Sequence, residues 1–234
     1  MRLLRKSLVP VVLAIPFLLT ACQRHYDEVE TAIQTNNINL VQRLLAQGEG
    51  DSLTEDDKSI LLCVACETDN PEMVRLVSEK LHPPITKDCV AYAVLYPSKS
   101  VLEVLFEYDK ERTQTLASLY FSSLEDVDMA SYLLSQGCSP VYHLHITEHL
   151  EVFKACVRAV EIKDISNDTI AITISNIIRG DDVERLAVLL NAGLDVDLPY
   201  IYEENTTIRE YIRNASPSAH KCVIFLDEWE KMKQ

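Results

Sequence analysis

Apolar residues recur at helical spacing in six segments of the chain, and each segment has the same internal order. In the segment 36–48, Ile38, Val41, Leu44 and Leu45 are apolar, and most of the residues between them are polar. Residues three and four positions apart lie on one side of an α-helix, so this pattern predicts an amphipathic helix. The other five segments with this order begin at residues 69, 97, 125, 148 and 181.

A second helix is predicted before each of these segments, for example in the ranges 27–35, 60–68, 89–96 and 171–180. Small residues such as Ala32, Ala65 and Ala93 recur in these helices and would let neighbouring helices approach closely. Successive segments begin 33, 28, 28, 23 and 33 residues apart. A helix pair of this size cannot bury its apolar side alone, whereas stacked pairs share a core. We therefore predict an all-α fold, a helical-repeat solenoid over residues 26–234.

The end of the chain predicts a capping helix at about 217–233. Ser216 and Pro217 are suited to the N-cap and the first helical position. The helix carries apolar residues that would cover the last exposed edge of the array, namely Val223, Phe225, Leu226, Trp229 and Met232. Only five glycines occur in 234 residues, which argues against an all-β fold rich in tight turns.

The repeat resembles the ankyrin repeat, most closely at residues 149–157 and 188–200. In that family a glycine ends the second helix and a β-turn finger follows, which implies the same role for Gly48, Gly137 and Gly193. The Thr-Pro-Leu-His signature of ankyrin units is absent. Because the middle steps are short, plain helical hairpins are the alternative to fingers there, and another helical-repeat family is the alternative for the array.

The first 21 residues have the three parts of a secretory signal. Arg2, Arg5 and Lys6 give a positive start, an apolar run of twelve residues follows at 8–19, and small residues precede Cys22. The run is shorter than the roughly 20 residues of a membrane-spanning helix, so a short membrane anchor is the weaker alternative.

The stretch Leu19-Thr20-Ala21-Cys22 resembles the lipobox of bacterial lipoproteins. The resemblance implies a signal peptide at 1–21, lipidation of Cys22, and a lipidated tether at 22–25. Gln23 follows the cysteine where an aspartate would imply retention at the inner membrane. The expected location is therefore the outer membrane, with the domain facing the periplasm.

The formal net charge of −14 disfavours nucleic acid and anionic lipid head groups as partners. It would attract a basic protein, although acidity that only keeps the protein soluble is an equal alternative. The acidic residues expected to meet a partner lie between predicted helices, at Glu55, Asp56, Asp57, Glu203 and Glu204.

Cys63 and Cys66 form a CxxC motif. Without a preceding strand, we interpret Cys66 as a small core residue, with a Cys63–Cys66 disulfide and thiol redox chemistry as weaker alternatives. In an oxidising compartment the six cysteines other than Cys22 could form disulfides, but their pairing does not follow from the sequence. The cluster His143, His145 and His149 could bind zinc, yet His149 occupies a turn position that is often histidine in ankyrin repeats.

The sequence contains no Gly-rich phosphate loop, nucleophile elbow or kinase motif, and its acidic tracts lack the calcium-loop pattern. We therefore expect no enzyme, no cofactor and no metal. The architecture resembles the immunity lipoproteins of type VI secretion phospholipase effectors. That resemblance implies a lipid-anchored module that binds and neutralises a secreted phospholipase toxin. The alternatives are an envelope lipoprotein scaffold for another periplasmic protein and, less favoured, a CxxC redox helper.

Overall fold

The computed structural model describes residues 26–215 and 218–233. The expected signal peptide, the tether with Cys22, and the predicted helix start at Ser216 and Pro217 lie outside these residues. The chain divides into two compact units, Met1–Leu116 and Ala117–Gln234. The described parts of both units are helical and contain no strand, with one isolated β-bridge between Pro199 and Thr207.

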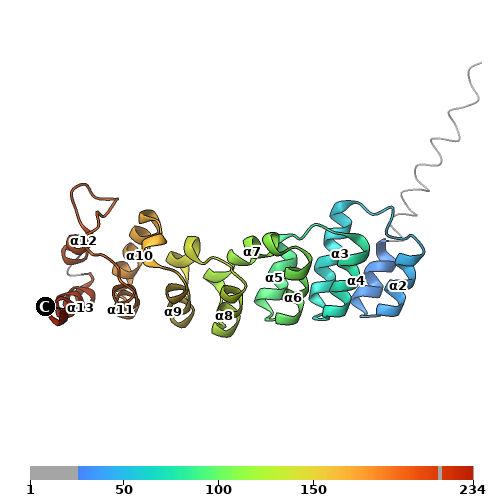
Figure 1. The fold of residues 1–234 in the computed structure, drawn as a ribbon, viewed down its shortest axis with the longest axis horizontal. Coiled ribbons are helices and arrows are strands. Elements are labelled where there is room, and N and C mark those ends of the chain that lie inside the picture. The colour runs from blue at the N-terminus through green and yellow to red at the C-terminus, as the bar shows by residue number, and fades with distance from the viewer. Residues whose placement is uncertain (1–25, 216–217, 234) are drawn as a thin grey trace, which may run out of the picture. The chain divides into compact units, whose positions relative to one another are not determined.

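Unit 1 is built from helices that pair along the chain (Figure 1). Residues 26–34 are helical, and the following helices are α2 (Ile38–Ala46), α3 (Glu55–Glu67), α4 (Pro71–Leu81), α5 (Lys87–Leu95) and α6 (Lys99–Tyr108). The helix α7 (Lys110–Ser118) contains the division between the units. Within unit 1, α4 packs against α2 and α6, α3 packs against α5, and α3 and α5 pack against their partners α4 and α6.

Unit 2 is also built from helices that pack in succession along the chain. Its elements are η1 (Phe121–Ser123), α8 (Val127–Ser135), η2 (Val141–Ile146), α9 (Leu150–Ala159), η3 (Ile162–Asp164), α10 (Asn167–Gly180), α11 (Val183–Asn191), α12 (Ile208–Asn214) and α13 (His220–Lys233). The helices α8, α9, α11 and α13 pack in series, and α10 packs against η2, α11 and α12.

The six predicted amphipathic helices are confirmed as α2, α4, α6, α8, α9 and α11. Each begins two residues after the start of its segment. The reason is local, because a polar side chain of the residue before most helices accepts a hydrogen bond from the first turn. Such N-caps include Asn37, Asn70, Ser98, Asp126 and Asp182.

The predicted glycine helix ends are also confirmed. Gly48, Gly137 and Gly193 have φ of 85°, 86° and 95°, in the left-handed region that glycine adopts without steric cost. At the turns inside the helix pairs, Asn36, Asp69 and Asp181 are left-handed as well, with φ of 52°, 51° and 49°. Asn and Asp are the non-glycine residues that best tolerate this conformation.

Two details of the predicted fold are wrong. A 3-10 helix, η2, precedes α9 in place of a first helix of a hairpin, because the connection 136–149 is short and holds Pro140. The C-terminal helix predicted at about 217–233 is described as α13 from His220 to Lys233, and its predicted start at Pro217 lies outside the described residues. In this helix Cys222 and Leu226 are fully buried, whereas Met232, expected in the core, is 74% exposed.

Candidate protein-binding pocket between α3 and α5

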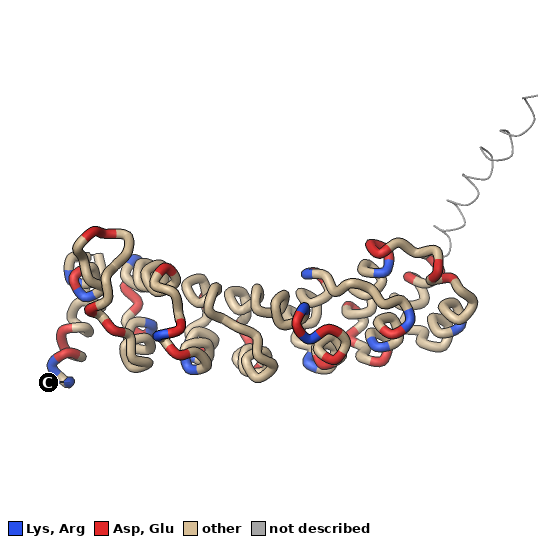
Figure 2. Tube along the Cα trace, turned by 45° about the horizontal axis from the view of Figure 1, so that its top comes forward, with Lys and Arg blue, Asp and Glu red and all other residues tan. Residues whose placement is uncertain are grey.

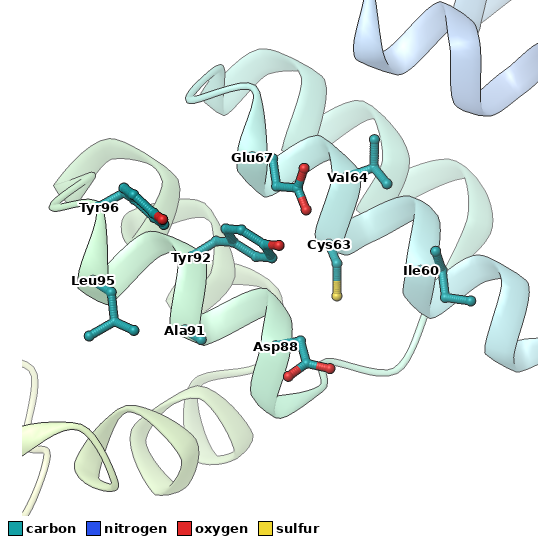
Figure 3. Close-up of a pocket in the computed structure, with 9 residues that line it drawn as sticks. All are labelled: Ile60, Cys63, Val64, Glu67, Asp88, Ala91, Tyr92, Leu95 and Tyr96. Carbon is teal, nitrogen blue, oxygen red and sulfur yellow. The ribbon is translucent and has the colours of Figure 1, made fainter. Parts of the chain in front are cut away.

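A pocket of about 420 Å³ lies between α3 and α5 in unit 1 (Figure 3). We call it the α3–α5 pocket. Its lining residues are Ile60, Cys63, Val64 and Glu67 of α3, together with Asp88, Ala91, Tyr92 and Leu95 of α5 and the following residue Tyr96.

The lining residues follow the helical period on both helices. Positions 60, 63, 64 and 67 of α3, like positions 88, 91, 92 and 95 of α5, lie three or four residues apart and so share one side of their helix. The opposite sides are buried, with Leu61, Leu62 and Ala65 of α3 fully covered. Each helix therefore has one side that is buried in the core and another side that lines the pocket.

The rim of the pocket exposes large apolar side chains. Ile60 is 48% exposed, Leu95 47% and Tyr96 72%. The rings of Tyr92 and Tyr96 are stacked, with centroids 6.1 Å apart and planes 18° from parallel. Aromatic side chains of this kind combine large contact area with little loss of conformational freedom, and they dominate the energetics of protein interfaces.

The polar groups of the pocket are acidic. The carboxylates of Glu67 and Asp88 belong to the lining, which contains no lysine or arginine. The neighbouring carboxylate of Glu67 raises the pKa of Tyr92, because its negative charge favours the protonated phenol over the phenolate. Figure 3 shows Tyr92 directed from α5 toward Glu67 on α3. Two carboxylates beside aromatic faces favour a cationic group as the occupant.

One lining residue, Cys63, has a second thiol nearby, that of Cys89, which lies outside the lining. The hydroxyl oxygen of Thr86 lies 3.3 Å from Sγ of Cys63 and 3.1 Å from Sγ of Cys89. The neighbouring Cys63 thiol, together with the hydroxyl of Thr86, lowers the pKa of Cys89. The neighbouring Cys89 thiol together with burial raises the pKa of Cys63.

Cys63 and Cys66, the predicted CxxC pair, both lie in α3 as free thiols. Cys66 is buried in the core, which agrees with its interpretation as a small core residue. Burial raises the pKa of its thiol. The thiol that shares the Thr86 hydroxyl with Cys63 is Cys89, on the next helix pair. The six cysteines of the described residues are all free.

The first group of acidic residues expected between helices belongs to a helix instead. Glu55, Asp56 and Asp57 form the first turn of α3, where the helix dipole favours negative charge. Asp57 completes a capping box, because its carboxylate accepts a 3.0 Å hydrogen bond from the backbone N–H of Thr54. Glu55 pairs with Lys58 at 2.8 Å. Two of these three carboxylates thus have local partners.

Glu203 and Glu204 lie in the segment 199–207, which we call the finger. A backbone hydrogen bond of 2.7 Å from the N–H of Tyr200 to the carbonyl of Thr206 and the bridge from Pro199 to Thr207 close its base. The tip exposes Tyr202 (56%) beside the two glutamates, and Figure 2 shows the acidic positions there in red. The finger therefore presents an aromatic ring and negative charge on one loop of unit 2.

The histidine cluster is spread over two elements. His143 and His145 lie in η2, and His149 precedes α9, with its Nε2 3.7 Å from a carboxylate oxygen of Glu125. Burial and the neighbouring His145 lower the pKa of His143. Within the described residues, no group of three or more His, Cys, Asp or Glu is placed to hold a metal ion. Among the same residues, none of the helices has the length and apolar character needed to cross a membrane.

Sequence reasoning missed most of the α3–α5 pocket. Asp88, Tyr92 and Tyr96 were assigned no role, and Cys89 was not paired with Cys63. The sequence does contain a signal for this lining. Positions 88, 91, 92 and 95 recur at helical spacing and lie on one side of α5, next to its buried side. Which other helix this set would face depends on tertiary packing.

Comparison with protein-family models, with curated proteins and with solved structures gave no match to this chain.

Proposed function

We propose that this chain is a protein-binding module, an immunity protein that binds and neutralises a secreted phospholipase toxin. The observation that carries the binding function is the α3–α5 pocket, an aromatic and acidic hollow whose rim exposes Ile60, Leu95 and Tyr96. Large exposed apolar groups rimmed by polar residues are typical of interaction sites.

We propose further that the helix pairs form a degenerate ankyrin-like array. The left-handed turns at Asn36, Asp69 and Asp181 support equivalent units, and so do the glycine helix ends at Gly48, Gly137 and Gly193. The finger after α11 supports the ankyrin-like assignment for the last full unit. Repeats of this type bind partners through fingers and first helices, and the α3–α5 pocket lies on two first helices.

The chemistry of the pocket defines the contact that the partner makes. An arginine or lysine side chain of the toxin enters between Glu67 and Asp88 and lies against the tyrosine rings, while apolar side chains of the toxin cover Ile60 and Leu95. The net charge of −14 steers such a basic surface toward the module during association.

The immunity role and the location rest on the leader and on the resemblance to immunity lipoproteins. A lipid on Cys22 holds the module at the outer membrane, facing the periplasm, where a toxin delivered by a neighbouring cell would act. More than one acyl chain makes such anchoring stable, since each buried CH₂ contributes about 0.8 kcal/mol. Because protection depends on binding, the chain needs no catalytic group or cofactor of its own.

The test is a competition between an attacker that carries the effector encoded next to this protein and a target strain that lacks it. We expect the deletion strain to be killed and the complemented strain to survive. The second arm measures binding of the purified full chain to that effector. Survival of the deletion strain together with a lack of binding would contradict the immunity role, and pull-down of a different envelope protein would then favour the scaffold alternative.

A further inference from the structure

We propose that Cys63 and Cys89 form a disulfide beside the α3–α5 pocket, which cross-links the first helices of two successive helix pairs. The cross-link goes beyond the proposed binding function and does not depend on the identity of a partner. It also differs from the Cys63–Cys66 pairing that the CxxC motif would give.

The two sulfurs are brought together by packing and by one hydroxyl group. Thr86, the N-cap of α5, places its Oγ1 3.3 Å from Sγ of Cys63 and 3.1 Å from Sγ of Cys89. Two sulfurs that share one hydroxyl oxygen as a neighbour lie on facing sides of α3 and α5, so a disulfide would link these two helices directly. The core contact between α3 and α5 holds the two helices side by side.

The two cysteines differ in a way that suits stepwise oxidation. Cys63 is partly exposed in the pocket, so a disulfide from solution can reach its sulfur. Cys89 is fully buried at the third position of α5, where the helix dipole and the Thr86 hydroxyl favour its thiolate. Cys66 is buried in the core, where an incoming disulfide cannot reach it.

The oxidant is a small or protein-borne disulfide. Cys63, which the pocket leaves open to solvent, loses its proton to water as its sulfur attacks one sulfur of this disulfide, which forms a mixed disulfide and releases the other sulfur as a thiolate that takes up a proton. The Cys89 thiolate then attacks Sγ of Cys63 and expels the remaining thiol. Overall the two cysteines lose two protons and two electrons, and the oxidant gains them as two thiols.

The cross-link would fix the spacing of the two helices that line the pocket. Cys63 belongs to the lining, and Cys89 lies one residue after the lining residue Asp88. A covalent bond at this depth holds Glu67 on α3 and Tyr92 on α5 at a constant separation. The oxidised form therefore presents a pre-organised pocket, which reduces the ordering that a partner must impose.

The experiment treats the reduced full chain with oxidised glutathione, blocks remaining thiols and maps tryptic peptides. Cys63 and Cys66 fall together in the peptide 59–75, and Cys89 falls in the peptide 88–99. We expect these two peptides to be joined by a bond that a reductant cleaves. A bond confined to the peptide 59–75, or two unlinked peptides after full oxidation, would overturn the proposal.

Matched variants separate the site from general thiol reactivity. Cys66→Ser should leave the cross-link unchanged, whereas Cys89→Ser should abolish it. Thr86→Val should slow its formation about tenfold, because one hydrogen bond to the thiolate is lost, and Thr86→Ser should restore the rate. An equal rate in Thr86→Val and the unchanged chain would contradict the role of Thr86. Loss of the cross-link in Cys66→Ser, with the helical circular dichroism intact, would contradict the pairing.

Discussion

The carboxylate of Asp181 accepts a hydrogen bond of 3.0 Å from the backbone N–H of Cys222, which connects the turn after α10 to the first turn of α13. The same carboxylate accepts a second bond of 3.3 Å from the backbone N–H of Lys221. The first N–H groups of a helix lack partners within it, so Asp181 acts as an N-terminal cap supplied from a distant position. Asn36 is left-handed like Asp181 and accepts a 2.7 Å bond from Asn70, the N-cap of α4.

Asp181→Asn should destabilise the protein at neutral pH. The hydrogen bonds from Cys222 and Lys221 lower the pKa of Asp181 in the folded state. A lowered carboxyl pKa contributes stability above the unfolded value of about 3.9, and this contribution is lost as the pH falls through the folded value. Asparagine tolerates the left-handed conformation, so the change is chiefly one of charge. Thermal unfolding should show a lower Tm for the variant at pH 7 and a smaller difference below about pH 4. A difference independent of pH would contradict this account.

Gly193→Ala and Gly180→Ala should change stability in opposite directions. Gly193 has φ of +95°, which an alanine adopts only with strain of about 1–2 kcal/mol. Gly180 ends α10 with no left-handed φ and no atom within 4 Å of an added Cβ, so alanine there should stabilise by about 0.4–1 kcal/mol. Urea unfolding of both variants is the measurement. Destabilisation of equal size at both positions would show that loss of glycine, not backbone conformation, is responsible.

Leu189→Ala should lower the free energy of unfolding by about 2–5 kcal/mol. Leu189 is 3% exposed in α11, so its truncation leaves a cavity in the core of unit 2. Leu95→Ala is the matched control, since Leu95 is 47% exposed at the rim of the α3–α5 pocket. Its Tm should stay close to that of the unchanged protein. A similar loss for both variants in urea unfolding would mean that burial does not decide the cost.

Tyr96→Ala should weaken binding of the proposed toxin by at least tenfold. Tyr96 is 72% exposed and stacks on Tyr92 beside the two carboxylates of the pocket, which is the environment of an interface hot spot. Tyr142→Ala is the control, because Tyr142 is 75% exposed outside the pocket. Titration calorimetry with the effector should separate the two variants. Equal affinities would place the contact surface elsewhere, and the finger around Tyr202 would be the next region to vary.

Cys22→Ala should abolish lipid attachment. The motive is the lipobox-like stretch that ends at Cys22 after an apolar run. Cells fed a clickable fatty acid should label the unchanged protein and not the variant. Label on the variant would mean that the leader has been misinterpreted, whereas an exported but unlabelled variant should still protect in part, because protection requires the location and not the acyl chains.

The sequence by itself determined where the helices lie and how they end. The segments that begin at 36, 69 and 181 became α2, α4 and α11, because helical period, N-caps and left-handed turn residues act within a few positions of the chain. Gly193 was predicted to end its helix for the same local reason.

Only the tertiary structure decided which side of one helix meets which side of the next. The contact of Cys63 with Cys89, the approach of Tyr92 to Glu67, and the cap that Asp181 gives to α13 all join residues from different helices. The CxxC motif suggests Cys66 as the partner of Cys63, because a sequence shows which residues are neighbours along the chain. Neighbours across a helix interface are set by how buried side chains fit together, which no local pattern encodes.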